Sequence, residues 1–293
     1  MLNRDHQAMT VDPSKLLIGI ASIELNSVPM GSIKDTSLEV TSTVKERYAG
    51  YPAQRMESTL ESVTGLVKVT AEEIGAAPVI SLLQNLFNNL VTQQAVTYDV
   101  KMLAPMVNTS NLELTAKTQL LPELTINWQD DWANIGFTFE CIGTNATSLI
   151  GRQVIGGVRQ PSTTIDITKL SIGKPKVLVN GVTVGAIQSL QLKVSGQVKK
   201  TERGYPKCTN GLIYLDSRID LDIVTEEKIL LGSDVQVEIQ QAVIDGGYLS
   251  FLFSHCNIAE DLSFKPQNDW SGYGQKIQPF KTDISQLITF TRN

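Results

Sequence analysis

The residues that most often carry catalysis are few in this sequence and far apart. It contains two histidines, His6 and His255, and three cysteines, Cys141, Cys208 and Cys256. His255 and Cys256 are neighbours, but adjacent residues of a strand point to opposite faces of the sheet, so we do not expect them to bind one metal ion. An isolated histidine rarely makes a metal site, and we expect a structural role for His255.

Pairs of acidic residues are the other group that acid–base chemistry would use. They occur at Glu72-Glu73, Asp130-Asp131 and Glu226-Glu227. Glu72 and Glu226 lie near the start of expected helices, where negative charge is favourable. The motifs GxSxG, GxxxxGK[ST], GxGxxG and HExxH do not occur in the sequence. The sequence therefore predicts a protein that is not an enzyme, with no catalytic residue, no metal site and no cofactor.

Composition indicates a soluble globular chain. Of 293 residues, 42% are hydrophobic and 19% are charged, and no apolar stretch is long enough to cross a bilayer. Residues 1–10 include charged side chains where a signal peptide needs an apolar run, so we expect synthesis in the cytoplasm. The cysteines form no CxxC pair and predict no disulfide framework. The formal net charge of -5 argues against binding nucleic acid by neutralising its phosphates.

An internal repeat organises the chain. When Val28 is placed on Val182 (182 − 28 = 154), positions 10 to 52 show seventeen identities without a gap, ending in Gly-Tyr-Pro at 50–52 and 204–206. About three would arise by chance. One inserted residue later the match resumes at a shift of 155, and near residue 124 it continues at 138, so the first copy has about seventeen more residues (155 − 138 = 17).

Two homologous domains follow from this repeat. We predict a first copy at residues 1–144 and a second at 163–293. Between them, residues 145–162 are rich in Gly, Ser and Thr, a composition typical of a linker.

Each copy has the residue pattern of a β-rich domain. Apolar and polar residues alternate from Leu38 to Lys45 and from Leu190 to Lys199, which is typical of a strand with one buried and one solvated face. Asn180-Gly181 is a strong signal for a hairpin turn.

A short helix is expected after the third strand of each copy. In the first copy an apolar stripe has helical spacing, and in the second Ser233 is the expected N-cap, Val235, Ile239, Ala242 and Val243 the stripe and Gly246 the end. The first-copy stripe is Leu82, Leu83, Leu86, Phe87 and Leu90. The predicted fold class is mainly β (α+β): two tandem homologous β-sandwich or open-barrel domains, each with one short flanking α-helix.

The order of these patterns resembles that of a known family. Residues 182–187, the alternating strand 190–198, the polar loop to Gly204-Tyr205-Pro206, the strand 215–225 with Glu226-Glu227, and a helix follow one another as in the tail tube (major tail) proteins of tailed phages. Residues 131–136 fit the closing part of that domain. The resemblance covers nearly the whole chain twice and rests on element order rather than on a catalytic signature.

The resemblance implies a structural virion protein. Domains of this family join their sheets edge to edge into six-domain rings that stack into a tube for DNA. A chain with two such domains would form a trimer with pseudo-sixfold symmetry. The implied partners are the chain itself, the tape measure, terminator and baseplate proteins, the sheath in a contractile tail, and DNA in transit without sequence-specific binding.

Two sets of residues would then have roles in the tube. The polar side of the strands predicts lumen-facing residues, namely Glu39, Lys45, Lys193, Lys199, Asp220 and Asp222. The loops around Gly-Tyr-Pro are longer and more charged than a local turn requires, and we expect them to contact the next ring. Their candidate residues are Arg47, Tyr51, Pro52, Arg203, Tyr205 and Pro206.

Two other functions fit the same residues. The first is another ring component of a tail, such as a distal tail, baseplate hub or terminator protein. The second is a two-domain ligand-binding β-sandwich, which would be expected to expose aromatic clusters, whereas aromatic residues are 6% of the sequence.

Overall fold

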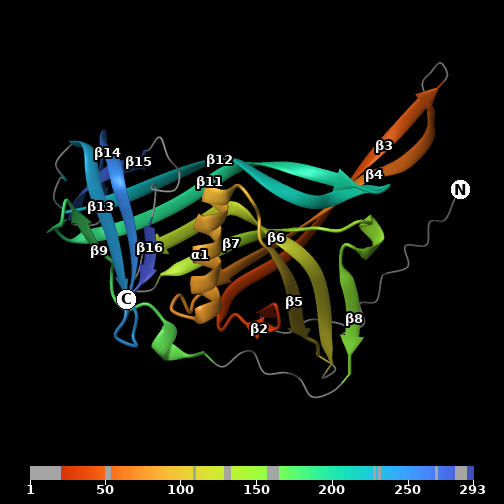
Figure 1. The fold of residues 1–293 in the computed structure, drawn as a ribbon, viewed down its shortest axis with the longest axis horizontal. Coiled ribbons are helices and arrows are strands. Elements are labelled where there is room, and N and C mark those ends of the chain that lie inside the picture. Colours follow the sequence, from red (N-terminus) through yellow and green to blue (C-terminus); the bar gives the residue numbers. More distant parts are fainter. Residues whose placement is uncertain are drawn as a thin grey trace, which may run out of the picture.

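The protein is mainly β-strand in the computed structural model, which describes residues 21–49, 54–107, 110–128, 133–156, 165–226, 229, 232–267, 270–280 and 289–293 (Figure 1). The strands form one continuous sheet of 16 strands. Those of the first half are β1 (Ser22–Leu25), β2 (Val28–Pro29), β3 (Ile33–Ala49), β4 (Gln54–Ala71), β5 (Thr97–Pro105), β6 (Asn111–Trp128), β7 (Asn134–Cys141) and β8 (Gly151–Ile155). Those of the second half are β9 (Lys176–Val179), β10 (Val182–Thr183), β11 (Ile187–Arg203), β12 (Lys207–Thr225), β13 (Gly232–Ala242), β14 (Tyr248–Gln267), β15 (Trp270–Pro279) and β16 (Thr289–Arg292).

The alternation predicted from Leu190 to Lys199 is confirmed by the burial of β11, whereas Val40 and Val44 in the strand predicted from Leu38 to Lys45 are exposed. In β11, Leu190, Leu192 and Val194 are at most 2% exposed, while Lys193 between them faces solvent. The same period of two in β12 buries Ile219. One face of the sheet therefore packs into the core and the other is polar.

The two halves use the same scheme of antiparallel pairings. In the first half the pairs are β1–β2, β1–β5, β3–β4, β4–β7, β5–β6, β6–β7 and β6–β8. In the second half they are β9–β10, β9–β13, β11–β12, β12–β15, β13–β14, β14–β15 and β14–β16. Each strand of the first half thus has a counterpart eight strands later.

The register gives the spacing of these counterparts. Leu38 pairs with Val67, and Leu192 pairs with Leu221, so both strands correspond at 154 (192 − 38 and 221 − 67). The one-residue insertion expected before the third strand is therefore wrong, because a shift of 155 would place a buried position opposite an outward one. Thr125 pairs with Gly136 and Ser263 with Gly274, which is a spacing of 138.

The two spacings differ by 16 residues (154 − 138), which is the length of helix α1 (Ala77–Thr92). Its predicted apolar stripe is buried, with Leu82, Leu83 and Leu86 at most 1% exposed. Pro78 lies in its first turn, where a missing N–H is harmless. Of the described residues, no helix is long and apolar enough to cross a membrane.

The helix predicted for the second half is wrong, because residues 232–242 form strand β13. Val235 and Ile239 fit helical spacing, but Val237 also points inward, being 0% exposed, so the operative period is two. The β-branched side chains of this segment favour a strand. α1 is the one α-helix in the described part of the chain.

The segment expected to be a linker contains ordered elements. The 3₁₀ helix η2 (Ala146–Ser148) is followed by β8, which pairs with β6 from Asn111 to Thr115. Asn145 caps η2 by accepting a hydrogen bond from the Thr147 N–H at 3.1 Å. Part of the segment 145–162 therefore belongs to the sheet of the first half.

One hydrophobic core extends through both halves. Trp128, at the end of β6, packs edge-on against Phe251 of β14 with ring centroids 6.2 Å apart, and Phe87 of α1 contacts Phe290 of β16. In Figure 1, α1 stands beside β16, so the helix of the first half covers apolar surface of the second.

Candidate assembly interface

The two halves are joined by direct strand pairing. Residues 190–194 of β11 pair antiparallel with residues 124–128 of β6, with Leu192 opposite Ile126 and Val194 opposite Leu124. All four of these side chains are at most 1% exposed. The connection therefore combines main-chain hydrogen bonds with a buried apolar seam, which is how a sheet edge binds another sheet.

A buried ion pair reinforces this junction. The Glu140 carboxylate, on β7 of the first half, is 0% exposed. It accepts hydrogen bonds from Lys200 Nζ, 2.8 Å from each of its oxygens, and from Thr209 Oγ1 at 2.6 Å. Both donors come from the hairpin of the second half. Because a buried carboxylate needs such partners, this contact fixes the hairpin against the first half.

Further polar contacts surround this ion pair. Gln119 accepts a hydrogen bond from the Leu212 N–H at 2.7 Å, and Tyr214 donates its hydroxyl to the Leu120 carbonyl. The Gln191 side chain donates to Asn127 at 2.6 Å. None of these residues was predicted to have a role. Their partners lie more than 60 residues away in the sequence, so no local pattern indicates them.

The corresponding strand of the first half lacks such cover. At a spacing of 154, Leu38 and Val40 of β3 correspond to Leu192 and Val194. Val40 is 55% exposed, whereas Val194 is 1% exposed, and Leu38 is partly buried. β3 pairs with β4 alone among the described strands, and in Figure 1 the β3–β4 hairpin projects from the body of the protein.

Four of the residues predicted to face a lumen share the polar face of the sheet. Lys193 of β11 is directly opposite Asp220 of β12 on one side and Thr125 of β6 on the other. From Thr125 the same face continues across the sheet through Gly136 of β7 and Thr70 of β4. It ends on β3, on the face that carries Glu39. Asp222 lies two residues from Asp220 on the same face. The other two, Lys45 and Lys199, are exposed farther along their hairpins.

Two acidic residues of this face, Glu39 and Asp220, are paired with basic side chains. Glu39 accepts from Lys68 Nζ at 2.7 Å, and Asp220 lies 2.8 Å from Arg218 Nε and 3.4 Å from Lys276 Nζ. A shallow hollow of about 460 Å³ crosses β4, β7, β6 and β11 and is lined by Lys68, Thr125, Thr138 and Lys193 among others. The face is thus polar and carries charges of both signs.

The prediction of a long polar loop around Gly-Tyr-Pro is wrong for the second half. Residues 199–203 continue strand β11 to Arg203, and the turn consists of residues 204–206. Hydrogen bonds to β12 pair the backbone N–H and C=O groups of this segment, although both faces of the hairpin are exposed to solvent there. Tyr205 is 75% exposed and Pro206 partly buried. In the first half Arg47 lies in β3, 3.7 Å from Glu57, while Tyr51 and Pro52 lie outside the described residues.

The tip of the second-half hairpin rests on the first half. The Gly143 N–H donates to the Thr209 carbonyl at 2.8 Å. A Cβ atom at Gly204, whose φ is +83°, would lie 2.9 Å from the Thr144 carbonyl oxygen. Gly204 is therefore needed for both its backbone conformation and this close approach.

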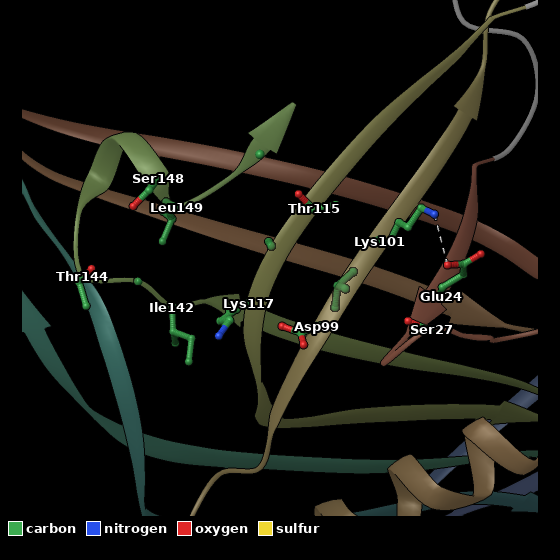
Figure 2. Close-up of a pocket in the computed structure, with 14 residues that line it drawn as sticks. Glu24, Ser27, Asp99, Lys101, Thr115, Lys117, Ile142, Thr144, Ser148 and Leu149 are labelled. Atoms are coloured by element: carbon green, nitrogen blue, oxygen red, sulfur yellow. Dashed lines mark ion pairs between the residues drawn. The ribbon is translucent and has the colours of Figure 1, made fainter. Parts of the chain in front are cut away.

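A second hollow, of about 650 Å³, lies between strands β5 and β6 and the segment 142–151 (Figure 2). Lys101 lines it and is 3.6 Å from Glu24 and 3.3 Å from Glu113. Asp99 and Lys117 also border it, as do Ser148 at the end of η2 and Leu149 just after it. Its charged groups are of mixed sign and are spread along an open surface, which resembles a groove rather than an enclosed catalytic cleft.

The residues first considered for chemistry do not form a site in the described structure. His255 pairs with Asp234, and Glu73 is held by the backbone N–H groups of Ser32 and Asp166, each at 2.9 Å. Among the described residues no three His, Cys, Asp or Glu side chains are grouped as metal ligands would be. Among the described residues no helix follows Glu226 before strand β13, and Asp130, Asp131 and Glu227 lie outside the described residues.

The three cysteines are expected to be unreactive in the folded protein. Burial raises the pKa of Cys141 and of Cys256 to about 12, and also raises the pKa of Cys208. Because only the thiolate reacts, we expect Ellman's reagent at pH 8 to label no cysteine within minutes, and all three after denaturation in guanidinium. Rapid labelling before denaturation would contradict the burial of these thiols.

Comparison with known proteins adds no identification, since no family model and no curated protein matches this chain.

Proposed function

We propose that this chain is a ring-forming structural subunit of a phage-type tail tube. The observation that carries the proposal is the run of eight antiparallel strands β3–β4–β7–β6–β11–β12–β15–β14, in which the second half continues the sheet of the first. The pairing that joins the first half to the second could also join the second half of one chain to the first half of the next. Head-to-tail repetition of one junction closes into a ring when the rotation allows it.

Duplication of one tube domain supports this proposal. The seven matching pairings and the constant spacings of their strands are what two copies of a domain would give. Three chains then supply six domains and a sheet of 24 strands (3 × 8), matching the six-domain rings that the sequence resemblance implies. One chain with two domains would replace two chains of a simpler ring.

The polar face of the eight-stranded run is the proposed lumen. Because the apolar face packs into the core, the polar face is the one that a closed ring would turn inward to DNA. Glu39 and Asp220 form ion pairs with Lys68, Arg218 and Lys276. These cations are therefore less available to bind DNA phosphates. Arg47, Arg203 and Tyr205, near the hairpin tips, are the proposed contacts with the next ring.

The proposed location is the virion tail. The partners there are further copies of the chain, the tape measure, terminator and baseplate proteins, and a sheath if the tail contracts. DNA passes through without sequence-specific contacts.

The test is direct observation of the purified protein. We expect negative-stain images to show rings with six similar lobes that stack into hollow tubes, and mass photometry to show a species of about 96 kDa (3 × 32.1 kDa). A single closed ring that never stacks would favour another ring component of a tail. Monomers under all conditions, including high concentration and crowding, would contradict the proposal.

A further inference from the structure

We infer that residues 36–40 of β3 pair antiparallel with residues 262–266 of β14 in a second copy of this chain. The inference rests on the proposed ring-forming function and names the surfaces and the register of the joint between chains. It is built from the junction that the structure already contains.

The junction between the halves supplies the geometry. There β6 lies between two partners: β7 on one edge and β11 on the other. The counterpart of β6 is β14, and the counterpart of β7 is β15, which pairs with residues 263–267 of β14. In the described structure the other edge of this part of β14 has no partner strand. The counterpart of β11 is β3, whose edge opposite β4 is likewise unpaired.

The register transfers without adjustment. Subtracting 154 from β11 and adding 138 to β6 converts the pairs Leu192–Ile126 and Val194–Leu124 into Leu38–Phe264 and Val40–Leu262. Each of these apolar residues of β3 therefore takes a register position opposite an apolar residue of β14. The pairs between them are polar, Ser37–Lys265 and Glu39–Ser263. The two spacings come from pairings within each half and not from any contact between β3 and β14.

Burial points to the same surface. Val28 of β2 and its counterpart Val182 are both exposed, at 52% and 71%, so exposure there is a common property of the two halves. Val40 at 55% and Val194 at 1% differ instead. The difference arises because Val194 is covered by β6 of the first half. A strand of the same shape from a second chain would cover Val40 in the same way.

The two joints differ at the place of the buried ion pair. Lys200 corresponds to Glu46, and Glu140 corresponds to Gln278. The joint between chains therefore has no counterpart of the Lys200–Glu140 pair and relies on main-chain hydrogen bonds and the apolar seam. Substitutions at Leu38 and Val40 should accordingly affect it strongly.

Cysteine pairs test the register. Glu39→Cys combined with Ser263→Cys is expected, after mild oxidation, to give covalent dimers and trimers on a non-reducing gel. Lys193→Cys with Thr125→Cys, which the structure pairs directly within the chain, should oxidise without a change in mass and so calibrates the chemistry. Glu39→Cys with Lys265→Cys, displaced by two residues, should cross-link at least about fivefold less, because diagonal neighbours are about 7–8 Å apart.

A charge on the seam tests the surface independently. Val40→Asp is expected to abolish rings while leaving the far-ultraviolet circular dichroism and the monomer unchanged, since its side chain is exposed in the isolated chain. Val28→Asp, similarly exposed but away from the joint, should assemble as the wild type does.

The outcomes separate this inference from the proposed function. Rings that form normally with Val40→Asp, or rings in which the calibrated intrachain pair oxidises but the Glu39–Ser263 pair does not, would overturn the inferred joint and leave the ring-forming function intact. Absence of any assembly of the wild-type chain would overturn both.

Discussion

Replacing Lys200 with methionine is expected to destabilise the protein by about 3 kcal/mol. The substitution keeps the aliphatic part of the side chain but removes the ammonium group that contacts both oxygens of Glu140. Because Glu140 is 0% exposed, its charge is then left in the core with Thr209 as its remaining hydrogen-bond donor in the described structure. We place the loss at the low end for a buried pair because the Lys200 side chain is 39% exposed, so water can reach the site.

Urea denaturation followed by circular dichroism measures this loss, with Lys199→Met as the matched control. Lys199 is the exposed neighbour on the same strand, and its replacement should change the free energy of unfolding by less than about 0.5 kcal/mol. Adding Glu140→Gln to Lys200→Met should recover part of the stability, because the uncompensated charge is gone. Equal effects of Lys199→Met and Lys200→Met would show that the ion pair does not hold the halves together.

Local patterns in the sequence predicted the long strands because burial follows a period of two over many residues. Leu190, Leu192 and Val194 alternate with polar residues, and strict alternation is typical of a half-buried strand and not of a helix. The stripe of α1 is equally local, with Leu82, Leu83 and Leu86 on one side of the helix. In the second half, Val235 and Ile239 fit both periods, and the choice depended on Val237, whose burial is set by the neighbouring strands β9 and β14.

The candidate interface depends on relations that no local pattern contains. Glu140 lies in an apolar strand and would be unfavourable there alone; its partner Lys200 is 60 residues away. Leu38 and Val40 indicate a buried strand face in the sequence, yet Val40 is exposed in the single chain. The sequence pattern indicates the apolar character of that face, and we propose that a second copy of the chain buries it.

Replacing Trp128 with alanine is expected to cost about 3–5 kcal/mol, the largest effect of a single substitution considered for this protein. Trp128 ends β6 at the junction, is 2% exposed and packs edge-on against Phe251 of the second half. It also pairs with Leu190 of β11. Alanine would leave a cavity between the halves, and because strands on both sides are fixed by pairing, the cavity cannot close by collapse.

Trp128→Phe is the matched control. The indole nitrogen of Trp128 is buried without a hydrogen-bond partner in the described structure, so phenylalanine removes no hydrogen bond and keeps an aromatic ring against Phe251. We expect it to cost no more than about 2 kcal/mol. Urea unfolding followed by far-ultraviolet circular dichroism measures the stability of both variants. The midpoints can be compared directly if the dependence of the unfolding free energy on urea concentration is unchanged. Were Trp128→Ala no worse than Trp128→Phe, the apolar contact between the halves would not be what holds this end of the junction.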